Sequence, residues 1–297
     1  MPSLLQNMPP FVLILSTLIG LTLHVLAPAL VAIITLGGGI TFAAHVVVIA
    51  SIGASILSGF SLLPGLITLT AYGLLPLIAA AALLKQHGLQ YSARYMAAGL
   101  GLLVLISTIA GALLHEGGLR EFISLLMSPM FEEAQQQVAV SDFETLQVLT
   151  QAQQMMISIL PGLVALSVWF AWWGDIVLAR NFANRYGFYK GDQASPLALS
   201  FGKKFAYLFL VLLLLANLAS GDLQYIGINA AIMIGGLLAA QGIAVGHSWL
   251  KTKNMTLSIS MMYLMLFIWS FMIVPFVIVG LMDIWFDYRR KFPAVGG

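Results

Sequence analysis

The sequence has no charged side chain before Lys85: no Asp, Glu, Lys or Arg occurs in the preceding residues. A soluble domain needs charged groups on its surface to stay solvated and unassociated. A bilayer has a hydrocarbon core of about 30 Å, which a helix of about 20 apolar residues crosses. The uncharged stretch is long enough for roughly three crossings. It therefore predicts an integral membrane protein.

Cysteine is absent too, which excludes disulfides, thiolate metal sites and a cysteine nucleophile. The sequence also lacks a Gly-x-Ser-x-Gly elbow, a P-loop, a dinucleotide fingerprint and a His-Glu-x-x-His pair. The net charge of +2 is too small to indicate nucleic acid. No basic region precedes the first apolar run, so we expect an uncleaved first span. We expect no enzymatic activity, no cofactor, no metal and no nucleic-acid partner.

Apolar residues dominate what is present: 60% of the chain is hydrophobic and 8% is charged, against about 25% charged in a soluble domain. We predict an all-α, polytopic membrane bundle of about eight transmembrane helices, which forms one domain over residues 1–297. Pro28, Pro76 and Pro275 fall inside apolar runs and predict kinked, broken or re-entrant helices. The predicted helices cover residues 10–36, 40–59, 62–84, 95–115, 153–178, 203–219, 225–249 and 256–286.

The segment 116–152 is predicted to be a long, acidic loop outside the membrane. Its only basic residue is Arg120, and its acidic residues are Glu116, Glu121, Glu132, Glu133, Asp142 and Glu144. Apolar residues between Phe122 and Phe131 recur at near-helical spacing, which predicts a partly amphipathic helix at the bilayer surface. Ser141 and Glu144 have the spacing of a capping box. The helix of the fifth span is therefore predicted to start near residue 142.

Lys and Arg predict the topology, because cytoplasmic loops are enriched in them. The 179–204 loop carries five basic residues and the C-terminus carries Arg289, Arg290 and Lys291. We expect both to be cytoplasmic, in a bacterial inner membrane. Three predicted helices separate them, however, and three crossings would place them on opposite sides. Two short or re-entrant segments within 256–290 would remove this conflict.

Short motifs in one order along the chain carry a family resemblance. They are Leu160-Pro161-Gly162-Leu-Val-Ala-Leu-Ser167, Leu178-Ala-Arg180, Gln241-Gly242 and Gly280-Leu-Met-Asp283-Ile-Trp285-Phe-Asp287-Tyr-Arg289-Arg290. The series resembles the YybS-like family of predicted bacterial membrane proteins. That family is distantly similar to the substrate-binding (S) subunits of energy-coupling-factor vitamin transporters and to the rod-shape protein MreD. The resemblance implies a helical bundle with a binding cavity and no catalytic centre. S subunits have six spans, fewer than predicted here.

The C-terminal charges form the first candidate site. Asp283 and Asp287 are four residues apart, on one helix face, and Arg290 follows Asp287 at a spacing that allows an ion pair. One interpretation is a charge network that docks a partner or gates a cavity. The other is an interfacial anchor, because Trp285 and Tyr288 are typical of the aromatic belt.

Asp175 is the second candidate, because a carboxylate in or beside a span is costly unless it is paired or hydrated. It follows Trp169, Trp172 and Trp173, which share one side of the helix and could stack on an aromatic ligand. Alternatively, the Trp residues anchor the helix and Asp175 pairs with Arg180, which lies within a turn and a half.

Other polar residues lie inside predicted spans. His24 and His45 are candidates for proton relay or for hydrogen bonds between helices. Gln241 is a candidate for an interhelical hydrogen bond or for lining a cavity. A small-residue series in the seventh predicted span predicts close helix packing, within or between chains: Gly235, Ala239, Gly242 and Gly246.

Three functions are consistent with these patterns. The leading hypothesis is a non-enzymatic, S-subunit-like protein that binds or transports a small molecule. The second is an MreD-like scaffold, which predicts a membrane protein partner or a homo-oligomer. The third is a membrane enzyme that acts on a lipid through Asp283 and Asp287. All three share the lipid bilayer as a partner.

Overall fold

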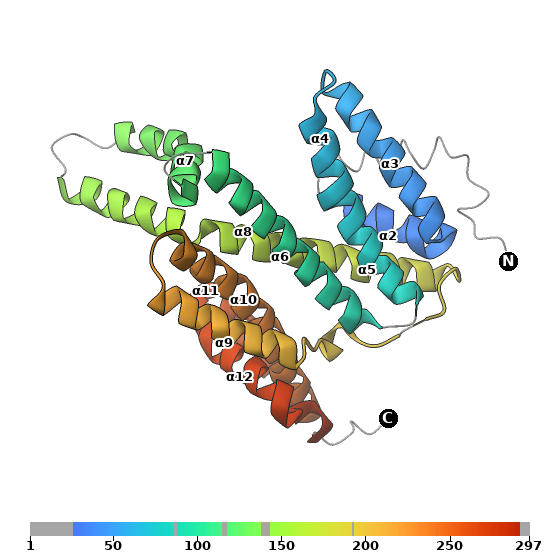
Figure 1. Ribbon diagram of the computed structural model, residues 1–297. Helices are drawn as coiled ribbons and strands as arrows, with labels where there is room; N and C mark the ends of the chain where they lie inside the picture. Colours follow the sequence, from blue (N-terminus) through green and yellow to red (C-terminus); the bar gives the residue numbers. More distant parts are fainter. Residues whose placement is uncertain (1–25, 86–87, 115–117, 138–142, 192, 292–297) are drawn as a thin grey trace. The chain divides into compact units, whose positions relative to one another are not determined.

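The computed structural model describes residues 26–85, 88–114, 118–137, 143–191 and 193–291, and these are helical without any strand (Figure 1). The predicted all-α bundle is confirmed. The chain divides into two compact units. Unit 1 comprises the chain up to Leu100 and the segment Val168–Ser200, and unit 2 comprises Gly101–Ser167 and everything from Phe201 onward.

Unit 1 begins with α2 (Ala27–Gly38) and α3 (Ile40–Leu57), which are separated by Gly39. Gly39 has φ of +88°, a left-handed conformation that glycine adopts without strain. The predicted break between the helices 10–36 and 40–59 is therefore confirmed. Pro28 lies in the first turn of α2, where its missing N–H has no helical partner to lose. The earlier part of the predicted helix 10–36, including His24, is outside the described residues.

The predicted helix 62–84 is confirmed in its bounds and contains an irregularity. It consists of α4 (Leu62–Ile67), the π-helical turn η1 (Thr68–Leu74) and α5 (Leu75–Leu84). The Leu75 N–H donates to the Thr70 carbonyl, five residues back. Pro76 follows directly, and its ring and missing N–H are incompatible with a regular α-turn before it. The predicted effect of Pro76 therefore takes the form of a widened turn.

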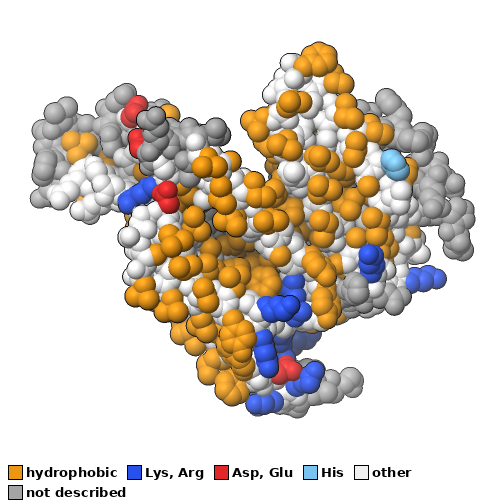
Figure 2. All heavy atoms as spheres, viewed as in Figure 1, with side chains coloured by type: hydrophobic (Ala, Val, Ile, Leu, Met, Phe, Trp, Pro, Cys, Tyr) orange, Lys and Arg blue, Asp and Glu red, His pale blue; other side chains and the backbone are white. Residues whose placement is uncertain are grey.

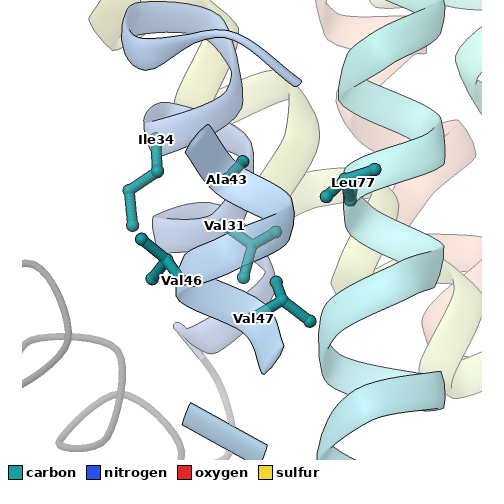
Figure 3. Close-up of a cluster of buried hydrophobic side chains, with 6 residues drawn as sticks. All are labelled: Val31, Ile34, Ala43, Val46, Val47 and Leu77. Carbon is teal, nitrogen blue, oxygen red and sulfur yellow. The ribbon is translucent and has the colours of Figure 1, made fainter. Parts of the chain in front are cut away.

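The core of unit 1 lies among α2, α3 and α5. Figure 3 shows six of its buried side chains: Val31, Ile34, Ala43, Val46, Val47 and Leu77. Lipid tails are as apolar as these side chains, so water exclusion gives little preference for helix–helix over helix–lipid contact. Close van der Waals packing of branched side chains therefore holds these helices together.

Two long helices contribute residues to both units: α6 (Leu89–Leu114) and α8 (Phe143–Arg185). The 43 residues of α8 extend about 65 Å at 1.5 Å per residue, roughly twice the hydrocarbon core. Its start at Phe143 confirms the predicted start near 142. The predicted Ser141–Glu144 capping box lies outside the described residues. Helix α7 (Gly118–Gln137) occupies much of the segment that was expected to be partly helical.

By length and composition, five helices of the described residues can cross a bilayer, or six if a bent pair counts as one span. Helix α9 (Lys203–Leu218) has 16 residues, or about 24 Å, and is shorter than the hydrocarbon core. The predicted number of about eight included this helix and the residues before 26.

Unit 2 is organised around α10 (Gly221–Thr252), which contacts α9, α11 (Thr256–Ile268) and α12 (Ile273–Phe286) (Figure 1). Of the apolar stretch that would cross the bilayer, 72% is buried in α10, against 28–50% in the other four long helices. Helix α10 is therefore the core element of this unit.

The last predicted helix, 256–286, is broken. Helices α11 and α12 are bent by 119° relative to each other at a break between Ile268 and Ile273. This confirms the interpretation of the segment as two short pieces. Pro275 lies in the first turn of α12, where a missing N–H is tolerated, so it follows the break.

Glycines allow α10 and α12 to approach each other at backbone distance. A Cβ on Gly242 would overlap the carbonyl oxygen of Phe276, and a Cβ on Gly280 would overlap the carbonyl oxygen of Leu238. Gly235 faces the ring of Phe209 in α9. The small-residue series predicted in the sequence therefore packs helices within one chain.

We expect Gly242→Ala to lower the free energy of unfolding by about 1–3 kcal/mol, the usual cost of overpacking, because the backbone of α12 cannot move aside locally. The control is Gly101→Ala in α6, where a new Cβ would meet nothing within 4 Å and helix propensity favours alanine. Denaturant unfolding in detergent measures both. Equal stability of the two variants would contradict the close α10–α12 contact.

The visible surface is largely apolar, and charged side chains are confined to a few places (Figure 2). Phe267 is 89% exposed and Leu62 is 83% exposed. Large apolar side chains at such exposure are incompatible with water over so wide an area. They are the expected contacts of a bundle with lipid.

Candidate functional site

Unit 1 contains a tryptophan cluster on α8. The Trp169 indole is fully buried and its Nε1–H donates to the Ala93 carbonyl of α6 at 3.2 Å. The Trp173 ring stacks on Trp169, with centroids 5.3 Å apart, and Trp172 contacts Tyr72 of the π-helical turn at 5.4 Å. Two of the three rings therefore serve helix packing. Trp173 packs on Trp169 of its own helix and also lines the cavity described below.

Asp175 and Arg180 are both buried, at 8% and 4% exposure, and the predicted ion pair between them is wrong. Asp175 makes no hydrogen bond or ion pair with the described residues. Arg180 points to the following loop, where its Nη1 donates to the Ala194 carbonyl at 2.7 Å and its Nε and Nη2 donate to Asn181 Oδ1. The spacing of Asp175 and Arg180 in the sequence would allow an ion pair, but the Arg180 guanidinium instead donates to Asn181 and to the loop that follows α8.

The loop after α8 is fixed to the helices at several points. Tyr189 donates its hydroxyl to the Leu83 carbonyl at 3.3 Å, and Arg94 donates Nε to the Ser200 carbonyl at 2.7 Å. The side-chain amides of Asn184 and Gln193 exchange two hydrogen bonds, at 3.0 and 2.9 Å. These bonds give the loop, which includes the short 3-10 turn η2 (Pro196–Ala198), a defined conformation.

A cavity of about 640 Å³ lies between this loop and the start of α6, within unit 1. We call it the unit 1 cavity. Its lining combines aromatic rings, a cation, hydroxyl and amide groups, and apolar side chains: Gly88, Leu89, Gln90, Tyr91, Trp173, Lys190, Gly191, Ala194, Ser195, Pro196, Ala198 and Leu199. The Trp173 indole nitrogen is buried and has no hydrogen-bond partner among the described residues. A donor in this state is costly unless something else accepts from it.

Unit 2 contains a buried polar network around Asp283, which we call the Asp283 network. The Asp283 Oδ2 accepts from Gln241 Nε2 and from Arg289 Nη2, each at 2.8 Å. Its Oδ1 accepts from the Tyr288 N–H at 3.0 Å, and Gln241 Oε1 accepts from the Phe201 N–H at 2.9 Å. Asp283 is 3% exposed and Gln241 is fully buried. The network therefore joins the segment just before α9, the helix α10 and the end of α12.

Asp287 and Arg290 lie outside this network. They form an ion pair at 2.7 Å, with side chains 48% and 87% exposed. Asp287 ends α12 in a left-handed conformation, with φ of 44°. Asp283 and Asp287, which the sequence places on one helix face, therefore have different environments. The Asp283 carboxylate is buried and hydrogen-bonded, whereas the Asp287 carboxylate is at the surface. They do not face a common space, as a shared catalytic site would require.

A second polar arrangement, the α8–α10 bridge, repairs a gap in α8. Pro161 has no N–H to offer the Ile157 carbonyl, and the Tyr225 hydroxyl donates to that carbonyl at 2.7 Å. Asn229 inserts between Gly162 and Ser158: its Oδ1 accepts from the Gly162 N–H at 2.8 Å, and its Nδ2 donates to the Ser158 carbonyl at 3.0 Å. All backbone groups freed by Pro161 are therefore satisfied.

Neither Asn229 nor Tyr225 was predicted from the sequence to pair with the helix that contains Pro161. The available signal was Pro161-Gly162 inside a predicted span, because a freed carbonyl in a membrane must find a partner. The sequence does not indicate which helix supplies that partner.

The histidines have different environments. His45 is exposed on α3 and contacts the Thr41 carbonyl of its own helix at 2.8 Å, so it takes no part in either site. His247 contacts the Tyr263 hydroxyl of α11 at 3.1 Å. Among the described residues, no three His, Asp or Glu side chains are placed to hold a metal ion.

Long apolar helices, buried polar bridges between them and an apolar exterior define a multi-pass, all-α membrane protein. The family model described as predicted membrane protein (DUF2232) matches residues 11–284, so the chain belongs to that family. Comparisons with curated proteins and with solved structures gave no match.

Proposed function

We propose that the protein binds a small molecule in the unit 1 cavity, as the substrate-binding subunit of a transporter does, and that it is not an enzyme. The observation that carries this proposal is the cavity itself. Its volume of about 640 Å³ lies within the usual range of ligand pockets, about 300–1,000 Å³. Its mixed lining is also typical, with a few polar groups placed among apolar and aromatic surfaces.

The hydrogen bonds that fix the cavity's frame support the proposal. Arg180 holds Ala194, Arg94 holds Ser200 and Tyr189 is tied to α5. A preformed site loses less conformational entropy when a ligand binds. A loop that only connected two helices would not need three such hydrogen bonds. They are consistent with a loop that is held ready for a ligand.

The suggested likeness to YybS-like proteins and S subunits agrees with this proposal, as does a bacterial inner-membrane location. The Asp283 network supports the proposed topology. It places the basic C-terminal segment beside Phe201 and hence beside Lys203 and Lys204. Both basic clusters can then face the cytoplasm: α9 leads away from that side, α10 leads back to it, and the bent α11–α12 pair ends on it again.

The alternative functions have less support. The hypothesis of an MreD-like scaffold rested on the small-residue face of α10 as a surface for a partner. Gly235 and Gly242 of that face instead pack against other helices of this chain. The hypothesis of a lipid enzyme rested on Asp283 and Asp287 as the catalytic pair. Both carboxylate oxygens of Asp283 already accept hydrogen bonds within the chain.

Filling the unit 1 cavity tests the proposal. Ala198 lines the cavity and Ala98 is exposed elsewhere on α6 in the same unit, so Ala198→Trp and Ala98→Trp are a matched pair. We expect native mass spectra of gently purified protein to show a bound small molecule in the wild type and in Ala98→Trp. Ala198→Trp should lose it.

A ligand retained by Ala198→Trp would contradict the proposed site. A wild-type protein without bound ligand, which is also not stabilised thermally by vitamins, nucleosides or lipids, would contradict the proposed function. A stoichiometric protein partner in place of a ligand would favour the scaffold.

A further inference from the structure

Asp175 is a buried acid that the fold does not use as a hydrogen-bond acceptor. The residue is 8% exposed, and it makes no hydrogen bond or ion pair with the described residues. Within the described part of the chain, the buried side-chain atoms without a partner belong to Ser92, Trp173 and Asp175. A hydroxyl and an indole stay neutral, so Asp175 is the one of the three that can ionise.

The place of Asp175 on α8 limits its access to water. It lies in the stretch Thr145–Arg185, which is long and apolar enough to cross a bilayer and contains no other acidic residue. Trp172 and Ala179, one turn to either side on the same helix face, are both buried. Trp172 contacts the Tyr72 ring of the π-helical turn. Asp175 therefore belongs to the face of α8 that packs inside unit 1.

Unit 1 contains basic residues that could have paired with this acid, but they are placed elsewhere. They are Lys85, Arg94, Arg180, Arg185 and Lys190. The two that are not exposed, Arg94 and Arg180, donate to backbone carbonyls of the loop after α8. The other three are exposed. The position of Asp175 is therefore not explained by a structural ion pair with the described residues.

Asp283 shows by contrast how this chain stabilises a buried carboxylate. It is 3% exposed, and its two oxygens accept three hydrogen bonds, one of them from Arg289. A buried carboxylate that lacks such partners is strongly unfavourable in its charged form. The uncharged acid avoids most of this cost, and an isolated acid within a membrane span is by default a functional candidate.

We propose that Asp175 is a proton-binding site of unit 1. In the arrangement described here, its carboxyl group holds a proton taken from water and the side chain is uncharged. The O–H bond breaks, and the proton returns to water, when a movement of α8 or its neighbours lets water reach the carboxyl group. Uptake and release of one proton are thereby linked to the packing of unit 1. This inference goes beyond the proposed function and does not depend on a ligand in the unit 1 cavity.

Infrared spectroscopy of the full chain tests the proposal, because the C=O stretch of a carboxylic acid is separate from the bands of a carboxylate. The protein is measured at neutral pH in a detergent without ester groups. Asp175→Asn is the test variant. Asp222→Asn is the matched control, because Asp222 is an exposed acid in the first turn of α10. We expect Asp175→Asn to lose one carboxylic-acid band and Asp222→Asn to lose carboxylate bands.

Labelling of the wild type with dicyclohexylcarbodiimide is a second measurement that needs no variant. This apolar reagent reacts with a carboxyl group that carries a proton: the proton passes to a nitrogen of the reagent, and the carboxyl oxygen bonds to its central carbon. The whole reagent is thus added. We expect mass spectrometry to find it on the peptide that contains Asp175 and not on the peptide that contains Asp222.

Loss of carboxylate bands in Asp175→Asn, with no acid band lost, would overturn the inference. Should that variant not fold, the labelling decides, and label on Asp222 without label on Asp175 would also overturn it. Neither measurement involves a bound small molecule, so a failure here leaves the proposed function standing. Conversely, an empty cavity in the native mass spectra would reject the proposed function and leave the proton site standing.

Discussion

Replacing Asp283 by alanine is expected to lower the free energy of unfolding by about 3–5 kcal/mol, the usual cost of breaking a buried charge pair from one side. The substitution leaves Arg289, Gln241 and the Tyr288 N–H without the acceptor they share. Gln241 is fully buried and the Arg289 side chain is 18% exposed, so water can replace the carboxylate only in part. Because the network joins α9, α10 and α12, unit 2 should lose its packing cooperatively.

Asp287→Ala is the matched control, since it removes the same group from the same end of α12. Its ion pair with Arg290 is largely exposed, and exposed pairs contribute about 0–1 kcal/mol. Denaturant unfolding in detergent should therefore separate the two variants clearly. Similar losses for both would show that burial of Asp283 does not determine its contribution.

A large effect of Asp283→Ala with little effect of Asp287→Ala would also decide between interpretations of the C-terminal motif. A catalytic or partner-docking pair requires both carboxylates, and losing either one should abolish function. An anchor requires only Asp283. The Trp285 ring lies 6.1 Å from the Tyr207 ring of α9 between centroids, so it also ties the end of α12 to α9.

Hydrophobic runs predicted the helices well, because each helix must satisfy its own backbone in lipid and its length is set by the bilayer. The predicted helix 62–84 and the predicted start near 142 match the structure. The break after Ile268 also agreed, since it was needed to reconcile two basic clusters with the number of spans. What these features share is that local composition determines them.

The sites depend on pairings that local composition does not encode. Gly162 and Asn229 are 67 positions apart and Gln241 and Asp283 are 42 apart. Asn217 is of the same residue type as Asn229, but its side chain bonds a carbonyl of its own helix. His45 also bonds a carbonyl of its own helix. The loop beside the unit 1 cavity is held by hydrogen bonds to backbone carbonyls. Every residue has such a carbonyl, so the sequence does not show which ones are used. Only the three-dimensional arrangement distinguishes the functional candidates.

Replacing Asn229 by leucine is expected to cost about 2–6 kcal/mol, because the buried Gly162 N–H and the partly buried Ser158 carbonyl each lose a partner worth about 1–3 kcal/mol. Leucine has as many side-chain heavy atoms as asparagine, so the substitution leaves no cavity and the lost hydrogen bonds would account for the change. Asn217→Leu is the control: Asn217 is exposed, and surface substitutions usually stay within about 0.5 kcal/mol. Unfolding titrations of both variants in detergent measure the difference.

A double-mutant cycle then tests whether the α8–α10 bridge exists because of the proline. Tyr225→Phe leaves the Ile157 carbonyl unpaired and should cost about 1–3 kcal/mol. In a Pro161→Ala background, residue 161 regains an N–H that can donate to Ile157, so the same Tyr225→Phe change should cost much less. Additive losses would mean that the hydroxyl contributes by packing alone. A positive coupling would establish that α10 supplies what the proline removed, which makes the gap in α8 a tolerated feature of this bundle.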